Sequence, residues 1–105
     1  MNALILLTLA TVPVPGPVSH PGSWISYPPA AMRNAEEGEV GYVLEVDAAG
    51  KPFDCRISAS SGFPTLDAET CRMILLRARF HPAKDAAGKP VASRYAGKVN
   101  YSLAE

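Results

Sequence analysis

The sequence predicts a two-layer α+β sandwich, in which a three-stranded, mainly antiparallel sheet carries two helices on one face. Residues 40–46, 53–57 and 95–103 alternate apolar with smaller or polar side chains, which is typical of strands. Residues 66–79 carry apolar side chains at the three- and four-residue spacing of an amphipathic helix. With a shorter helix within residues 28–38, the order is α-β-β-α-β, which lets the sheet and helices bury one apolar layer.

The first helix is indicated by its two ends. Pro28 and Pro29 suit the first turn of a helix, and Gly38 suits the position just past the last turn. The stretch presents a modest apolar face, made of Ala30, Ala31, Met32 and Ala35.

Two strands joined by a turn are expected next. The inward side chains of the first strand are expected to be Val40, Tyr42, Leu44 and Val46. Those of the second are expected to be Phe53, Cys55 and Ile57. The turn chemistry of residues 47–51 predicts an antiparallel hairpin, and residues 60–64 end its second strand.

A longer helix and a third strand complete the domain. The helix is expected to bury one stripe of side chains, formed by Leu66, Cys71, Ile74, Leu75 and Ala78, and Pro82 stops it. The third strand is expected to turn one row toward the same layer, namely Tyr95, Val99, Tyr101 and Leu103.

One six-residue sequence, DAAGKP, occurs twice, at residues 47–52 and 85–90. The flanking sequences do not match, which argues against a duplicated unit. We expect the first copy in a hairpin turn and the second in a loop between helix and strand, so the likeness is interpreted as recurring turn chemistry.

The N-terminal part of the chain differs in composition from the rest. All twenty charged residues follow position 32, and six of the ten prolines precede position 30. Residues 1–14 are apolar, but a membrane span needs about 20 residues, so they are interpreted as a signal peptide or the remainder of a truncated anchor. Residues 15–26 are interpreted as a proline-rich linker and residues 27–103 as the globular domain.

Composition argues against several classes of function. A formal charge of zero argues against a nucleic-acid binder held by phosphate contacts and against a polybasic membrane-surface protein. The spacing of His20, His81, Cys55 and Cys71 fits no zinc pattern, so neither a metal nor another cofactor is expected. His81 is interpreted as a helix-terminal cation, and the chain offers no catalytic triad; we therefore expect no enzyme and no small-molecule substrate.

The segment from Tyr27 to Leu103 resembles the C-terminal domain of TonB-type energy transducers. The resemblance begins at Tyr27-Pro28 and runs in order through short motifs along most of the chain. These are Gly38-x-Val40, Asp47-x-x-Gly50, Ser60-Ser61-Gly62, Leu66-Asp67, Arg79-Phe80-x-Pro82-Ala83, Gly88-Lys89-Pro90-Val91 and the terminal Tyr101-x-Leu103.

This resemblance implies a periplasmic adaptor in energy-coupled transmembrane transport. Domains of the family grip outer-membrane receptors by adding an extended receptor peptide to the edge of their sheet. If a longer N-terminus supplies an anchor, the resemblance also implies inner-membrane motor proteins as partners. The alternative is a free-standing periplasmic interaction module without energy coupling. The receptor, its cargo and a homodimeric state stay open.

Two cysteines are predicted to form a disulfide. Cys55 is expected to point inward from the second strand, and Cys71 lies on the apolar stripe of the following helix. Both side chains would then enter the same layer, as a bridge requires, and an oxidising periplasm permits the bond. The alternative is two buried free thiols that pack as small hydrophobes.

The last strand is the predicted partner-binding site. A terminal strand that lies at a sheet edge presents unpaired N–H and C=O groups along its outer side. A charged side chain such as Lys98 on an edge strand disfavours pairing with another strand. The competing interpretation is therefore an edge protected in this way, which binds no partner. The resemblance favours binding through the backbone of residues 94–103. The residues assigned to this site are Arg94, Tyr95, Lys98, Val99, Asn100, Tyr101 and Ser102, with Tyr27 and Pro28 as the family motif.

Overall fold

The computed structural model describes residues 16–19 and 21–103, so the predicted leader at residues 1–14 lies outside the described residues. Within that part of the chain, no helix is long and apolar enough to cross a membrane. Three long strands form the main sheet: β2 (Gly38–Val46), β3 (Pro52–Ala59) and β7 (Ser93–Tyr101). Two α-helices accompany them: α2 (Pro29–Arg33) and α3 (Pro64–Arg77).

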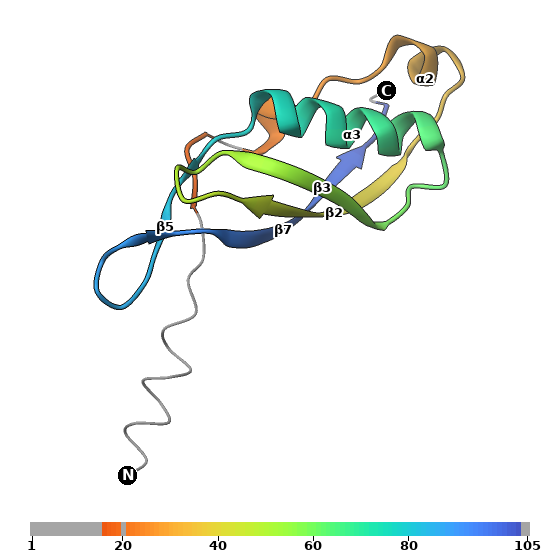
Figure 1. The fold of residues 1–105 in the computed structure, drawn as a ribbon. Coiled ribbons are helices and arrows are strands. Elements are labelled where there is room, and N and C mark those ends of the chain that lie inside the picture. Colours follow the sequence, from red (N-terminus) through yellow and green to blue (C-terminus); the bar gives the residue numbers. More distant parts are fainter. Residues whose placement is uncertain (1–15, 20, 104–105) are drawn as a thin grey trace.

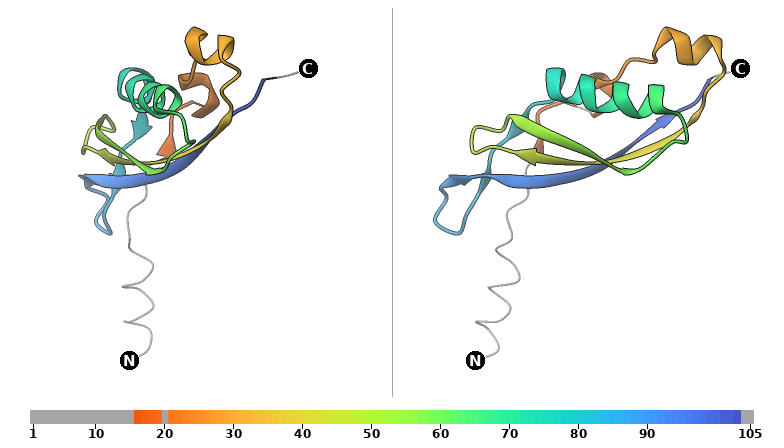
Figure 2. Two further views of the ribbon diagram at one scale, coloured as in Figure 1. Left: turned by 90° about the vertical axis from the view of Figure 1, so that its right-hand side faces the viewer. Right: turned by 45° about the vertical axis from the view of Figure 1, so that its right-hand side comes forward.

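The molecule has the predicted two-layer α+β architecture. The sheet has the order β3-β2-β7 and both of its strand pairs are antiparallel. Helix α3 crosses one face of this sheet, and the two views of Figure 2 show the helices on the same side of it (Figures 1 and 2). The short α2 lies beyond the end of the sheet, near the C-terminal end of β7 (Figure 1).

Short elements fasten the N-terminal segment to this sandwich. Strand β1 (Gly16–Pro17) pairs with β4 (Phe80–His81), and a 3-10 turn, η1 (Pro21–Trp24), follows. Trp24 is only 2% exposed and its ring lies 5.5 Å from that of Phe80. The segment predicted as an extended linker, residues 15–26, thus contributes a core side chain. Burying the large apolar indole of Trp24 stabilises the fold more than leaving it exposed to solvent.

The apolar layer between helices and sheet consists of two adjoining clusters. The larger lies under the C-terminal half of α3 and contains Trp24, Tyr42, Leu44, Val46, Ile74, Ala78 and Phe80. The smaller lies under the start of α3 and beside α2, and contains Ala31, Val40, Leu66 and Tyr101. Ile25 and Val99 pack against both clusters, so the N-terminal segment and β7 meet where the clusters join.

Several side chains predicted to face the core are exposed. Ile57 of β3 and Met32 of α2 are 36% and 48% exposed. Phe53 is 61% exposed because β3 carries a bulge between Glu45 and Val46 of its partner, and Phe53 is the extra residue. In α3 the buried face includes Thr70 and Met73, whereas Leu75 is 36% exposed. The apolar spacing in the sequence did not include Thr70, because its side chain is polar. Its hydroxyl can be buried because it has hydrogen-bond partners.

The two copies of DAAGKP adopt the same turn. Asp47 and Asp85 each accept two backbone hydrogen bonds at their Oδ1 atom, from the residues two and four positions later. Gly50 and Gly88 both have positive φ, at 86° and 82°. The second copy joins β5 (Ala83–Lys84) to β6 (Pro90–Val91), so it also closes a hairpin, and the expectation of a helix-to-strand loop was wrong.

Candidate functional site

Strand β7 lies at one edge of the main sheet, as predicted. Among the described residues it pairs with β2 alone, in a register that runs from Gly38 opposite Tyr101 to Val46 opposite Ser93 without a shift. Along an antiparallel strand, backbone groups point alternately to the neighbour and away from it. The outer side of β7 therefore presents a regular row of N–H and C=O groups.

The opposite edge of the sheet, β3, is built differently. Its pairing with β2 is interrupted by register shifts between Gly41 and Tyr42 and between Glu45 and Val46. Its first residue is Pro52, which lacks an N–H donor. Bulges and edge prolines are features that keep other strands from joining a sheet. The structure thus contrasts one irregular edge with one regular edge.

The side chains of β7 divide between the two faces of the sheet. Tyr95 and Val99 pack against the larger cluster under the helices. Arg94 and Lys98 lie on the other face and reach across to β2, where Arg94 Nε is 2.8 Å from Glu45 Oε2 and Lys98 Nζ is 4.0 Å from a carboxylate oxygen of Glu39. These cations therefore face away from the helix layer.

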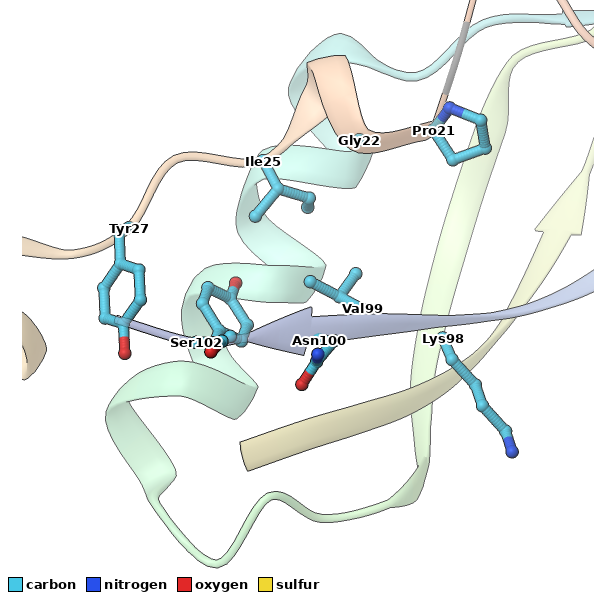
Figure 3. Close-up of a pocket in the computed structure, with 9 residues that line it drawn as sticks. Pro21, Gly22, Ile25, Tyr27, Lys98, Val99, Asn100 and Ser102 are labelled. Atoms are coloured by element: carbon cyan, nitrogen blue, oxygen red, sulfur yellow. The ribbon is translucent and has the colours of Figure 1, made fainter. Parts of the chain in front are cut away.

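A groove of about 500 Å³ runs along β7 on the helix side. One wall is the N-terminal segment and the other is the C-terminal half of β7. Figure 3 shows Ile25 and Val99 pointing toward each other across the groove, whereas Lys98 points the opposite way (Figure 3). The lining residues are Pro21, Gly22, Ile25, Tyr27, Lys98, Val99, Asn100, Tyr101 and Ser102.

Two tyrosines close one end of the groove, and both hydroxyls have partners elsewhere. The rings of Tyr27 and Tyr101 meet edge-on, with centroids 5.3 Å apart. The Tyr27 hydroxyl donates to the backbone carbonyl of Glu36, and the Tyr101 hydroxyl lies 2.9 Å from Thr70 Oγ1. Burial raises the pKa of the Tyr101 phenol, so the ring stays neutral.

Of the residues predicted for this site, the structure brings Tyr27 together with residues 98–102. Arg94 and Tyr95 lie farther along β7 and outside the groove, and Pro28 is the N-cap of α2. Sequence reasoning missed Pro21, Gly22 and Ile25. The apolar pair Trp24-Ile25 just before the Tyr-Pro motif was a usable signal, since apolar side chains in a free linker have no layer to pack in.

The predicted disulfide is present and lies away from the groove. Cys55 of β3 is bonded to Cys71 of α3, with Cα atoms 5.6 Å apart. Because β3 is the opposite edge strand, the bond links α3 to the edge of the sheet that is away from the groove. Among the described residues, no three His, Cys, Asp or Glu side chains gather in a way that would hold a metal ion.

Comparison with known proteins finds a matching family and a similar solved structure. Residues 24–103 match the family described as Gram-negative bacterial TonB protein C-terminal. The solution NMR structure of the Pseudomonas aeruginosa TonB C-terminal domain is similar with a TM-score of 0.64 at 20% sequence identity, over 89% of this chain and 88% of that one. No curated protein matches the sequence. The family match agrees with the resemblance noted from the motifs, and the structural match agrees with the fold.

Proposed function

Because the chain belongs to the Gram-negative bacterial TonB protein C-terminal family, we propose that it is a periplasmic adaptor that binds peptide segments of outer-membrane receptors. The peptide adds to the free side of β7 as a fourth strand of the main sheet. In this role the protein takes part in energy-coupled transport across the outer membrane.

The difference between the two sheet edges carries this proposal. An incoming strand needs a straight row of unpaired donors and acceptors, and the unshifted pairing of β7 with β2 supplies one. The bulged β3 edge, with proline at its start, supplies none of comparable length. A peptide that pairs by its main chain is therefore expected at β7.

The groove beside β7 supports the same location. Lys98, Asn100 and Ser102 belong to the row that faces away from the helices, yet they line a groove on the helix side. Lining residues from both rows of β7 place the groove along this strand. A docked strand would thus have its backbone on β7 and every second side chain in the groove.

Main-chain pairing also suits an adaptor that transmits mechanical force to the bound peptide. The peptide would be bonded to β7, which is bonded along nine residues to the central strand β2. Such a ladder spreads a load over many hydrogen bonds, and it demands little of the peptide's side-chain sequence. One domain can then serve several receptors.

Amide chemical-shift mapping tests the proposal. The ¹⁵N-labelled full chain is titrated with a synthetic peptide that copies a periplasm-exposed segment of an outer-membrane receptor from the same genome. We expect shifts along residues 93–103 and in the segment around Ile25. Shifts confined to α3 or β3 would refute strand addition at β7.

Proline substitutions supply a functional check. Successive N–H groups of β7 alternate between β2 and the free edge, so proline is placed in turn at Val99 and Asn100. The variant that keeps its fold by circular dichroism has lost an outward donor, and it is expected to lose peptide binding. A well-folded proline variant that binds normally would contradict the proposal.

A further inference from the structure

Strand β3 contributes little to the apolar core. Of its eight residues only Pro52 is buried, and Cys55 is partly buried. The apolar side chains of Phe53 and Ile57 are 61% and 36% exposed. Among the described residues, no buried member of the two clusters belongs to β3, whereas four belong to β2. Since buried apolar surface is what holds a strand against the helices that cover it, β3 is packed more weakly than the central strand.

The backbone pairing of β3 is also less regular than that of β7. The register between β2 and β3 shifts at two places, whereas the register between β2 and β7 shifts at none. A bulge leaves an extra residue unpaired and interrupts the run of hydrogen bonds. Of the two edge strands, β3 is thus the one that the backbone holds less firmly.

The disulfide compensates for this weak attachment. Among the described residues of β3, Cys55 is the one whose side chain packs against the larger cluster, and its bond to Cys71 reaches α3. The core holds this helix in place, because Leu66 and Ile74 are fully buried in the two clusters. The bond therefore ties the weakly packed edge strand to a firmly packed helix. Both cysteines are partly exposed, so a small dithiol can reach the bond.

We infer that this disulfide is a redox-sensitive switch for β3: its reduction lets β3 separate from β2, while α3, β2 and β7 keep their native arrangement. The reaction is a thiol–disulfide exchange with a dithiol. A thiolate of the dithiol attacks one sulfur and forms a mixed disulfide, and the second thiol of the reductant then attacks that mixed disulfide. The dithiol becomes a disulfide, the Cys55–Cys71 bond breaks, and the two electrons and two protons gained leave both cysteines as thiols.

The separation is local because the core does not depend on β3. The buried members of the two clusters come from the N-terminal segment, α2, β2, α3, β7 and the residues that follow α3. Segments with little buried apolar surface open at a lower free energy than the whole domain. The disulfide restricts the freedom of the opened strand, so opening is less favourable while the bond is intact.

The switch also determines which edges of the sheet are unpaired. With β3 in place, the side of the central strand β2 that faces away from β7 is paired. When β3 separates, the backbone groups on that side of β2 lose their partners, and an unpaired strand edge is prone to pair with other chains. The disulfide-bonded protein keeps β2 covered, whereas the reduced protein exposes it.

Hydrogen exchange of the full chain, followed by NMR, tests the inference. The samples are the disulfide-bonded wild type, the wild type reduced with dithiothreitol, and the variant Cys55→Ala/Cys71→Ala. Amides that bond β3 to β2 are compared with amides that bond β7 to β2. Reduction should lower the protection of the β3 amides at least about tenfold more than that of the β7 amides. The alanine variant should behave like the reduced wild type, and dithiothreitol should leave the variant unchanged.

Trypsin cleavage supplies an independent measurement. Strand β3 contains one basic residue, Arg56, and β7 on the other edge contains Arg94 and Lys98 as a matched control. Reduction should speed cleavage after Arg56 at least about tenfold and leave cleavage after Arg94 and Lys98 unchanged. All samples are reduced before the fragments are separated, because the Cys55–Cys71 bond would otherwise hold the two pieces together.

Three results overturn the inference. If reduction lowers protection by the same factor on both edges, the bond stabilises the whole domain and not β3 in particular. If the β3 amides keep their protection after reduction, backbone pairing and packing hold the strand without the bond. If the reduced wild type and the alanine variant are both unfolded by circular dichroism, the core depends on the bond. None of these results bears on peptide binding at β7, so the proposed function is tested separately.

Discussion

The ring of Tyr27 stands edge-on to the ring of Tyr101, with their planes at 82°, and so joins the start of the folded domain to the end of its last strand. Tyr101 continues the connection through Thr70 in α3, whose hydroxyl donates to the carbonyl of Leu66 at 2.8 Å. The end of the proposed peptide groove is thus tied to the central helix by aromatic packing and a buried hydrogen bond.

Removing both hydroxyls of the buried pair should cost less than the sum of the two single removals. Thr70→Val leaves the Tyr101 hydroxyl buried without a partner and is expected to lower the free energy of unfolding by about 1–3 kcal/mol. Tyr101→Phe should cost about 1 kcal/mol, and the double variant less than the sum of the two. Urea unfolding of all four proteins measures the coupling. Strictly additive losses would show that the two hydroxyls do not interact.

The two DAAGKP turns provide a matched pair of glycines. Alanine at Gly88 would meet nothing within 4 Å, so Gly88→Ala should cost only the strain of positive φ, about 1–2 kcal/mol. Alanine at Gly50 would in addition overlap the carbonyl oxygen of Phe80, whose N–H donates to the Gly50 carbonyl at 2.9 Å. Gly50→Ala should therefore cost at least about 2 kcal/mol more in urea unfolding. Equal losses would mean that the contact with Phe80 relaxes freely.

The Cys55–Cys71 bond should stabilise the fold without affecting peptide binding. It closes a loop with a sequence separation of 16, for which chain entropy predicts about 3 kcal/mol. The variant Cys55→Ala/Cys71→Ala should lose about that much in urea unfolding. Its affinity for a β7-directed peptide should equal that of the wild type at temperatures where both are folded. An unchanged unfolding midpoint, or lost binding in the folded variant, would contradict these expectations.

Asp67 should make stability depend on acidic pH. Partial desolvation acts to raise the pKa of its carboxyl, but hydrogen bonds from the Ser60 hydroxyl and from the Ser61 backbone and hydroxyl outweigh it and hold the pKa below its usual value. A depressed pKa contributes stability that is present above the unfolded-state value and is lost as the pH falls through the folded-state value.

The variant Asp67→Asn isolates this contribution. It is expected to be less stable than the wild type by about 1 kcal/mol at neutral pH, and the difference should shrink as the pH falls below about 4. Urea unfolding at several pH values follows the difference. A gap between the two proteins that stays constant down to strongly acidic pH would rule out the ionised carboxylate as its source.

Side chains on the outer face of β7 should matter little for strand addition. Asn100→Ala and Ser102→Ala keep every backbone donor and acceptor, and both side chains are exposed. Peptide affinity should therefore stay within about twofold of the wild type, because main-chain pairing carries the binding. Titration of a receptor peptide by amide shifts measures it. A tenfold loss in either variant would point to side-chain recognition on this face.

Much of the fold was readable from local patterns. Alternation along residues 40–46 and 95–103 predicted β2 and β7, and the turn residues around Gly50 predicted the hairpin that joins β2 to β3. The pairing of Cys55 with Cys71 was also predictable, because two inward positions on neighbouring elements face one layer. The strands and the turn depend on residues a few positions apart, so the chain specifies them by periodicity and turn chemistry.

The groove, by contrast, is a product of tertiary structure. Ile25 and Val99 are far apart in the sequence, and they face each other only because Trp24 is buried beside Phe80 and thereby fixes the N-terminal segment over β7. Likewise, the bulge that exposes Phe53 arises from the pairing of β3 with β2, which no local pattern of β3 contains. Sequence patterns report which faces of an element are apolar, whereas the partner of each face is chosen by packing across the whole domain.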